Sequence, residues 1–76
     1  MPILRKVSGE KLLKIFCNKL GFSVLRRKGS HVSIAKQIPA GKIGTVIPMH
    51  PELKIGTLKA ILKQAGVSED EISEFL

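Results

Sequence analysis

The spacing of apolar residues changes twice along this chain, and this feature constrains the fold more than any other. Apolar residues recur at intervals of three and four in residues 12–20, alternate with other residues between 22 and 47, and return to helical spacing in residues 58–65. The first and last patterns are typical of an amphipathic helix, and the middle one is typical of strands. The sequence therefore predicts two helices that flank a β-sheet.

The first helix is predicted over residues 9–20. Ser8 is a typical N-terminal cap, and Gly21 stands just after the last apolar residue, where helices commonly end. The predicted apolar face consists of Leu12, Leu13, Phe16, Cys17 and Leu20. Cys17 is therefore expected to be a buried small apolar residue rather than a nucleophile.

Three strands are predicted between the helices. Two of them flank a turn at Lys28, Gly29 and Ser30, where glycine can adopt a positive φ. The third strand is the β-branched stretch "KIGTVIP", which Pro48 ends. Because the connections are short, the strands should form an antiparallel meander.

A second helix is predicted over residues 57–65, after the loop "MHPELKIG", in which Gly56 interrupts any regular pattern. It should end at Gly66. Ser68 and Glu71 then match a capping box that opens a short last helix. The predicted fold is α+β, in the order α-β-β-β-α with a three-stranded antiparallel sheet, helices on one face and a short C-terminal helix.

The length of 76 residues allows one domain with a modest core, so residues 1–76 are expected to form a single domain. The chain has three Phe and neither Tyr nor Trp, which predicts an aliphatic core and disfavours nucleic-acid binding by stacked aromatic rings. One cysteine cannot form an internal disulfide or a paired-cysteine zinc site. No apolar run is long enough for a membrane span. We expect a cytoplasmic protein without metal or cofactor.

The charge is distributed unevenly. Residues 1–63 contain all thirteen Lys and Arg and two carboxylates, which leaves +11, whereas the last thirteen residues contain four carboxylates and no cation, which gives −4. The sum is the net charge of +7. A basic body of this kind attracts polyanions, so nucleic acid is the first partner to consider. Lysines that only keep a small protein soluble are the alternative.

His31 is the candidate catalytic residue. If Val32 and Ile34 point toward the helices, then His31, Ser33 and Ala35 point outward, next to the predicted phosphate ligands Arg26, Arg27 and Lys28. An imidazole can take the proton of a ribose 2′-OH, and neighbouring cations can stabilise the charge that develops at phosphorus. The pattern is thus compatible with metal-free RNA cleavage. An exposed or merely phosphate-contacting His31 remains the alternative.

Two further residues are candidates for the same site. Lys36 keeps the second strand cationic and is a further predicted phosphate ligand. His50, in "PMHPE", is a possible second proton-transfer group if its loop folds back over the sheet. The simpler interpretation is that His50 is a loop histidine that packs locally. The acidic residues cluster at the C-terminal end and predict neither a paired-carboxylate site nor a metal site.

Three stretches together resemble a known family: "SGEKLLKIFCNKLGF", "RRKGSHVSI" and "VIPMHPELKIGTLKAILKQAGVSEDEISEFL". The sequence is similar to the HicA (YcfA-like) toxins of prokaryotic type II toxin-antitoxin systems. The resemblance runs from about Ser8 to the C-terminal end. It implies a fold like that of the double-stranded RNA-binding domain, which agrees with the element order expected from periodicity.

The resemblance also implies a function. Members of this family are mRNA interferases, endoribonucleases that arrest translation, and a HicB-type antitoxin covers their active face. The family's catalytic histidine corresponds to His31 in "KGSH", and Gly29 and Ser30 shape the turn before it, at the substrate-binding site. The expected partners are therefore mRNA and a HicB-type antitoxin, with no cofactor.

Two other functions fit the same residues. A non-catalytic RNA-binding module could use the basic face to recognise the shape of a duplex, in which case His31 would affect only affinity. An interaction protein could use this face solely to dock an acidic partner. RNA binding without new chain ends would favour the first of these over a nuclease.

Overall fold

The chain follows the order α-β-β-β-α, with a short third helix after it. The computed structural model describes residues 4–76, so the first three residues of the predicted domain lie outside the described residues. The elements are α1 (Gly9–Lys19), β1 (Ser23–Lys28), β2 (His31–Ile38), β3 (Gly41–Pro48), α2 (Ile55–Ala65) and α3 (Glu69–Ser73). This confirms the predicted α+β class and the predicted order of elements.

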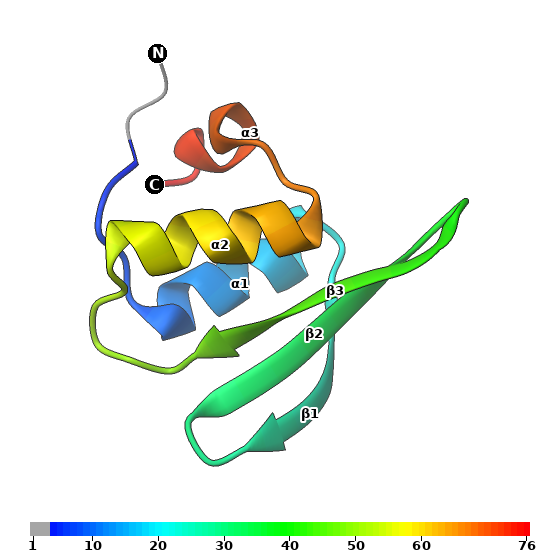
Figure 1. Ribbon diagram of the computed structural model, residues 1–76, viewed down its shortest axis with the longest axis horizontal. Coiled ribbons are helices and arrows are strands. Elements are labelled where there is room, and N and C mark those ends of the chain that lie inside the picture. The colour runs from blue at the N-terminus through cyan, green and yellow to red at the C-terminus, as the bar shows by residue number, and fades with distance from the viewer. Residues whose placement is uncertain (1–3) are drawn as a thin grey trace.

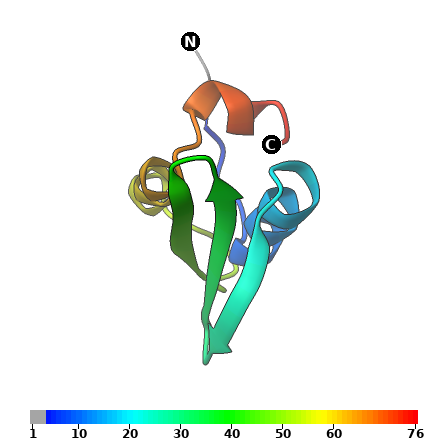
Figure 2. The ribbon, with the colours of Figure 1, turned by 90° about the vertical axis from the view of Figure 1, so that its right-hand side faces the viewer.

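The three strands form one antiparallel sheet in the order β1-β2-β3, so β1 and β3 are both edge strands. Helices α1 and α2 cover one face of this sheet and leave the other face open (Figure 1). In Figure 2 the strands lie in front of α1 and α2, and α3 lies at one end. Val32, Ile34 and Ile47 point toward the helices and are buried, whereas His31 and Val46 lie on the open face and are exposed.

The core is mostly aliphatic, as predicted. It contains fully buried leucines and isoleucines from α1, α2, α3 and the sheet, together with the rings of Phe16 and Phe22, whose centroids lie 5.0 Å apart. The predicted burial of Cys17 is wrong, because this side chain is only half-buried. Ile15 and Phe16 occupy the centre of the helix face that meets the core, and Cys17 lies at its margin.

Helix α1 begins where the sequence predicts. The Ser8 side chain accepts a hydrogen bond from the backbone N–H of Lys11 at 3.0 Å. Gly9 follows at a point of close approach, because a Cβ atom there would overlap the carbonyl oxygen of Pro48. The N–H of Gly9 also donates to the carbonyl oxygen of His50 at 2.9 Å. The start of α1 therefore sits directly on the end of β3.

Helix α2 begins two residues earlier than predicted, and Gly56 lies inside it rather than in the preceding loop. The N–H groups of the first helical turn need no intrahelical acceptor, so a glycine at this position interrupts little. Lys54 is the N-cap and has extended dihedral angles. The helix ends at Gly66, and the predicted capping box of Ser68 and Glu71 is present at the start of α3.

Candidate functional site

His31 is the first residue of β2 and follows a two-residue turn of Gly29 and Ser30. Gly29 has a φ of 59°, the positive value that a type II′ turn requires at its first loop residue. The carbonyl oxygen of Ser30 accepts a hydrogen bond from the N–H of Met49, which ties the turn to the end of β3. The Ser30 hydroxyl lies 3.5 Å from Nδ1 of His31. The exposed imidazole thus stands on an anchored turn.

The register of the sheet gives His31 its neighbours on the open face. It pairs with Lys28 on β1 and with Pro48 on β3. The next set of cross-strand partners on the open face consists of Arg26, Ser33 and Val46. Side chains directly opposite each other have Cβ atoms about 4.5–5.5 Å apart, and diagonal neighbours remain within reach of long side chains. One imidazole, one ammonium and one guanidinium group are therefore brought together on this face.

The predicted placement of Arg27 beside His31 is wrong. Arg27 pairs with Val32, whose side chain is buried under the helices, so Arg27 belongs to the covered side of the sheet. A β-bulge at Leu25 inserts one extra residue between Val24 and Arg26 in β1. The bulge reverses the alternation expected along this strand, and it places Arg26 rather than Arg27 on the open face.

Lys36 is also separated from His31. It alternates in β2 with His31 and Ser33 and so shares the helix side of the sheet with Val32 and Ile34. Its ammonium group lies 5.9 Å from the centroid of the Phe22 ring. Lys36 lies five positions after His31 in β2, a distance of roughly 16 Å along the strand. The predicted grouping of Lys36 with His31 is therefore wrong, because the alternation of the strand turns it toward the helices.

His50 lines a pocket of about 600 Å³ on the helix side of the β1–β2 turn. Its loop does fold back toward the turn, but the pocket is formed by the start of α1, Arg27 of β1 and the segment from Met49 to Pro51. Lys14 and Glu10 lie on the same pocket and form an exposed ion pair at 3.8 Å. The structure thus groups His50 with Arg27, and His31 with Lys28 and Arg26.

Sequence reasoning missed two residues of the open face. Pro48 and Val46 lie directly beside His31 and Ser33, where they add apolar surface to the open face. The signal that could have located them is the length of the second hairpin loop. A two-residue loop at Pro39 and Ala40 pairs Ile38 with Gly41, and counting back along both strands then pairs His31 with Pro48.

Within residues 4–76, no group of three or more His, Cys, Asp or Glu side chains is arranged to hold a metal ion. None of the helices in that range is long and apolar enough to cross a membrane.

Comparison with protein-family models matches residues 9–67 to the family described as the HicA toxin of bacterial toxin-antitoxin. The match extends from the first residue of α1 to the end of α2 and includes the whole sheet. Comparisons with curated proteins and with solved structures give no match. Because the family match covers most of the 76 residues, the chain belongs to the HicA toxin family of bacterial toxin-antitoxin systems, in which a toxin is paired with an antitoxin.

Proposed function

We propose that this toxin is an endoribonuclease that cleaves mRNA without a metal ion and thereby arrests translation. The observation that carries the proposal is the position of His31. This imidazole is exposed on the open face of the sheet, pairs with Lys28 across the strands and lies diagonal to Arg26. A proton-transfer group beside two cations is the combination that cleavage at a phosphodiester needs.

His31 would act first as a general base. It takes the proton of the ribose 2′-OH, and the resulting oxygen attacks the adjacent phosphorus. Lys28 and Arg26 stabilise the negative charge that accumulates on the phosphoryl oxygens in the transition state. The bond to the 5′-oxygen then breaks, and this oxygen takes up a proton from the His31 imidazolium or from water. The products are a 2′,3′-cyclic phosphate and a 5′-hydroxyl end.

The substrate would be RNA in a single-stranded or ribosome-bound form. The open face has cations for the backbone, and Pro48 and Val46 give it apolar contacts without an aromatic platform. The 2′-OH is the nucleophile, so DNA would not be cut. Translating mRNA lies in the cytoplasm, which is where the toxin would act.

The antitoxin would be of the HicB type and would cover the open face. That face is uncovered by any described element of this chain and is cationic near His31, so an acidic segment of the antitoxin could occupy the place of the RNA phosphates. Such a segment would block access to His31 directly.

The test is growth arrest on induced expression, combined with cleavage of a labelled RNA by the purified protein in excess EDTA. His31→Gln removes the proton-transfer group but retains a polar side chain, and it should abolish both activities. The matched control is Lys59→Gln, which removes an exposed cation from the outward surface of α2 and should leave both unchanged. Thermal unfolding of each variant verifies the fold.

Cleavage that survives in His31→Gln would remove this residue from the mechanism. If neither the parent protein nor the variant cuts RNA, with or without ribosomes, yet both bind it equally, the protein is a non-catalytic RNA-binding module instead. The exposed cations of the open face favour RNA binding in either case.

A further inference from the structure

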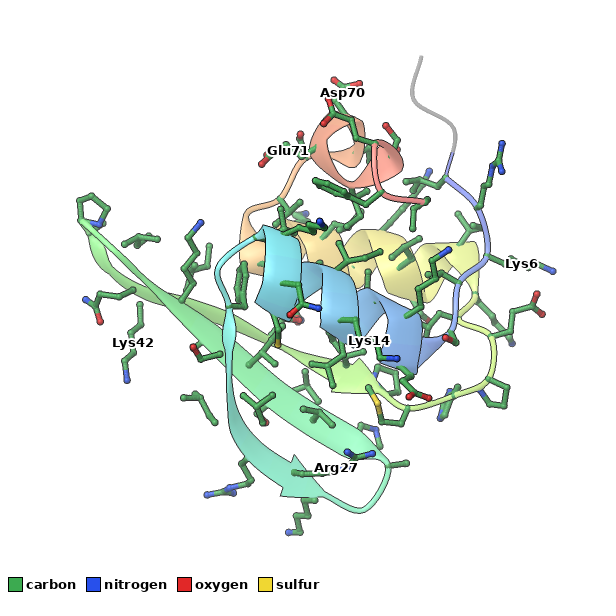
Figure 3. The ribbon with its side chains drawn as sticks, turned by 180° about the vertical axis from the view of Figure 1, so that it is seen from behind. Lys6, Lys14, Arg27, Lys42, Asp70 and Glu71 are labelled. Carbon is green, nitrogen blue, oxygen red and sulfur yellow. The ribbon has the colours of Figure 1, made fainter. Side chains whose placement is uncertain are left out.

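The pocket on the helix side of the β1–β2 turn lies outside the site proposed for cleavage. It measures about 600 Å³ and is walled by the first turns of α1, by Arg27 of β1 and by the segment that follows β3. Figure 3 labels two of the residues that line it, Arg27 on the β1–β2 hairpin and Lys14 on α1. The cleavage mechanism makes no use of this pocket.

Arg27 is the distinctive charged group of the pocket. Among residues 4–76, the one ion pair is that between Lys14 and Glu10, whose side chains are 69% and 76% exposed. The Glu10 carboxylate is thus adjacent to Lys14 and offsets part of its charge, while the Arg27 guanidinium has no carboxylate partner among the described residues. An arginine without a partner presents a planar set of donors that matches the oxygens of a phosphate.

The start of α1 adds a smaller contribution. The N–H groups of Gly9 and Lys11 already donate to His50 and Ser8, so they are not available to a ligand. The helix still directs the positive end of its dipole toward the pocket. The Ser8 hydroxyl accepts from Lys11 and keeps its own proton free for donation. Side chains, and Arg27 above all, would therefore bind an anion here.

Arg26 and Arg27 are adjacent in sequence and lie on opposite faces of β1. Because β1 is an edge strand, no further strand blocks a path from one face to the other. An RNA strand that leaves His31 across Lys28 and Arg26 can pass over this edge and meet Arg27 next. The acidic residues Asp70 and Glu71 lie at the opposite end of the molecule, so they do not repel a strand on this path (Figure 3).

We propose that this pocket is a second phosphate-binding subsite for the RNA strand whose reacting phosphate lies at His31, with Arg27 as its principal ligand. The inference rests on the proposed function, because it assigns a further part of the same substrate. The pocket is large enough for a phosphate and part of its nucleotide, and the Met49 and Leu13 side chains supply apolar walls.

The experiment measures RNA binding in the His31→Gln background, so that cleavage does not interfere. Arg27→Gln should weaken binding of a single-stranded RNA by about tenfold, because a charge-assisted hydrogen bond is lost. The slope of log K against log salt should fall by about 0.7, the value for one phosphate contact on a single strand. Arg27→Lys should lie between the parent and Arg27→Gln. Lys59→Gln, the matched control, should change affinity by less than about twofold.

Cleavage kinetics distinguish a role of Arg27 in this subsite from a role in the catalytic chemistry. In the protein with His31 intact, Arg27→Gln should raise KM and leave kcat unchanged, because the subsite binds substrate and transition state alike. A fall in kcat at saturating RNA would place Arg27 in the chemistry and overturn the subsite. If the parent protein does not cut RNA, the cleavage proposal fails, whereas the RNA-binding measurements still test whether Arg27 forms a phosphate-binding subsite.

The RNA-binding measurements have two further outcomes that would overturn the inference. Arg27→Gln could bind RNA as Lys59→Gln does, which would mean that no phosphate occupies the pocket. Alternatively, a hexaglutamate peptide could depend on Arg27 for binding while RNA does not, which would make the pocket a docking site for an acidic peptide. Thermal unfolding of Arg27→Gln and Arg27→Lys verifies that each variant retains the fold.

Discussion

The backbone N–H of Gly9 donates a hydrogen bond to the carbonyl oxygen of His50 at 2.9 Å, which joins the start of α1 to the loop after β3. The N–H of Met49 in the same loop donates to Ser30, in the turn before His31. One short segment therefore connects the first helix, the end of the sheet and the turn of the candidate site. The absence of a side chain at Gly9 is what allows the helix to approach so closely.

Gly9→Ala should destabilise the protein by about 1–3 kcal/mol, the usual cost of forcing extra volume into a packed contact. The added Cβ atom would overlap the backbone of Pro48, which cannot move aside as a flexible side chain would. The matched control is Gly56→Ala in the first turn of α2, where nothing lies within 4 Å. It should be neutral or stabilise by about 0.4–1 kcal/mol. Denaturant unfolding measures both, and equal stabilities for the two variants would contradict the close approach.

The buried hydroxyl of Thr45 donates a hydrogen bond to Oε1 of the exposed Gln64 at 2.8 Å, which links β3 to α2. Gln64→Ala should cost about 1–3 kcal/mol, because it leaves a buried hydroxyl without its partner. Thr45→Val should cost less, because water can solvate the exposed amide that remains. Chemical denaturation of the two variants tests this order, and a larger loss for Thr45→Val would contradict the assignment of Thr45 as the buried partner of this hydrogen bond.

The capping box of α3 should contribute measurably to stability. The Ser68 hydroxyl accepts from the N–H of Glu71 at 3.1 Å, and Ser68→Ala should cost about 1 kcal/mol. Ser73→Ala is the control, since its hydroxyl only donates to the nearby Asp70 carbonyl and the change should stay within about 0.5 kcal/mol. Thermal unfolding with matched buffers compares them. Equal losses would mean that the cap does not hold α3 in place.

The open face predicts different effects for two cations that the sequence groups together. Arg26 lies in the row next to His31, and Arg26→Gln should lower kcat/KM for RNA by about 10- to 100-fold. Lys36 lies on the helix side over the Phe22 ring, and Lys36→Gln should stay within about twofold of the parent. Initial rates on one labelled RNA give both values. A larger loss for Lys36→Gln would reverse the assignment of faces.

Much of the fold could be predicted because each element has a local signal. The helices have apolar residues at helical spacing with Ser8 and Ser68 as caps, and Gly29 marks the turn before His31. The outward direction of His31 follows from the inward direction of Val32 by simple alternation. Lys36 lies four residues after Val32 in the same strand. Simple alternation therefore predicts that its side chain points to the helix side of the sheet, as that of Val32 does.

Other features had no local signal. The bulge at Leu25 depends on how β1 pairs with β2, and nothing in the string "VLRRK" distinguishes it from a regular strand. The faces of the sheet on which Arg26 and Arg27 lie can therefore be assigned only from the pairing register of β1 with β2. The pocket between Arg27 and His50 joins residues 23 positions apart in sequence, and only the contact between α1 and the end of β3 creates it.

Under the proposed function, His31 transfers a proton in metal-free cleavage at the ribose 2′-OH. The most direct measurement is the end chemistry of fragments made from one labelled RNA in excess EDTA, beside the same RNA with 2′-deoxy substitution at the cut position. The proposed mechanism predicts 2′,3′-cyclic phosphate and 5′-hydroxyl ends for the parent protein, no cut at the deoxy position and no fragments with His31→Gln. Fragments with 5′-phosphate ends, or cleavage at the deoxy position, would contradict it.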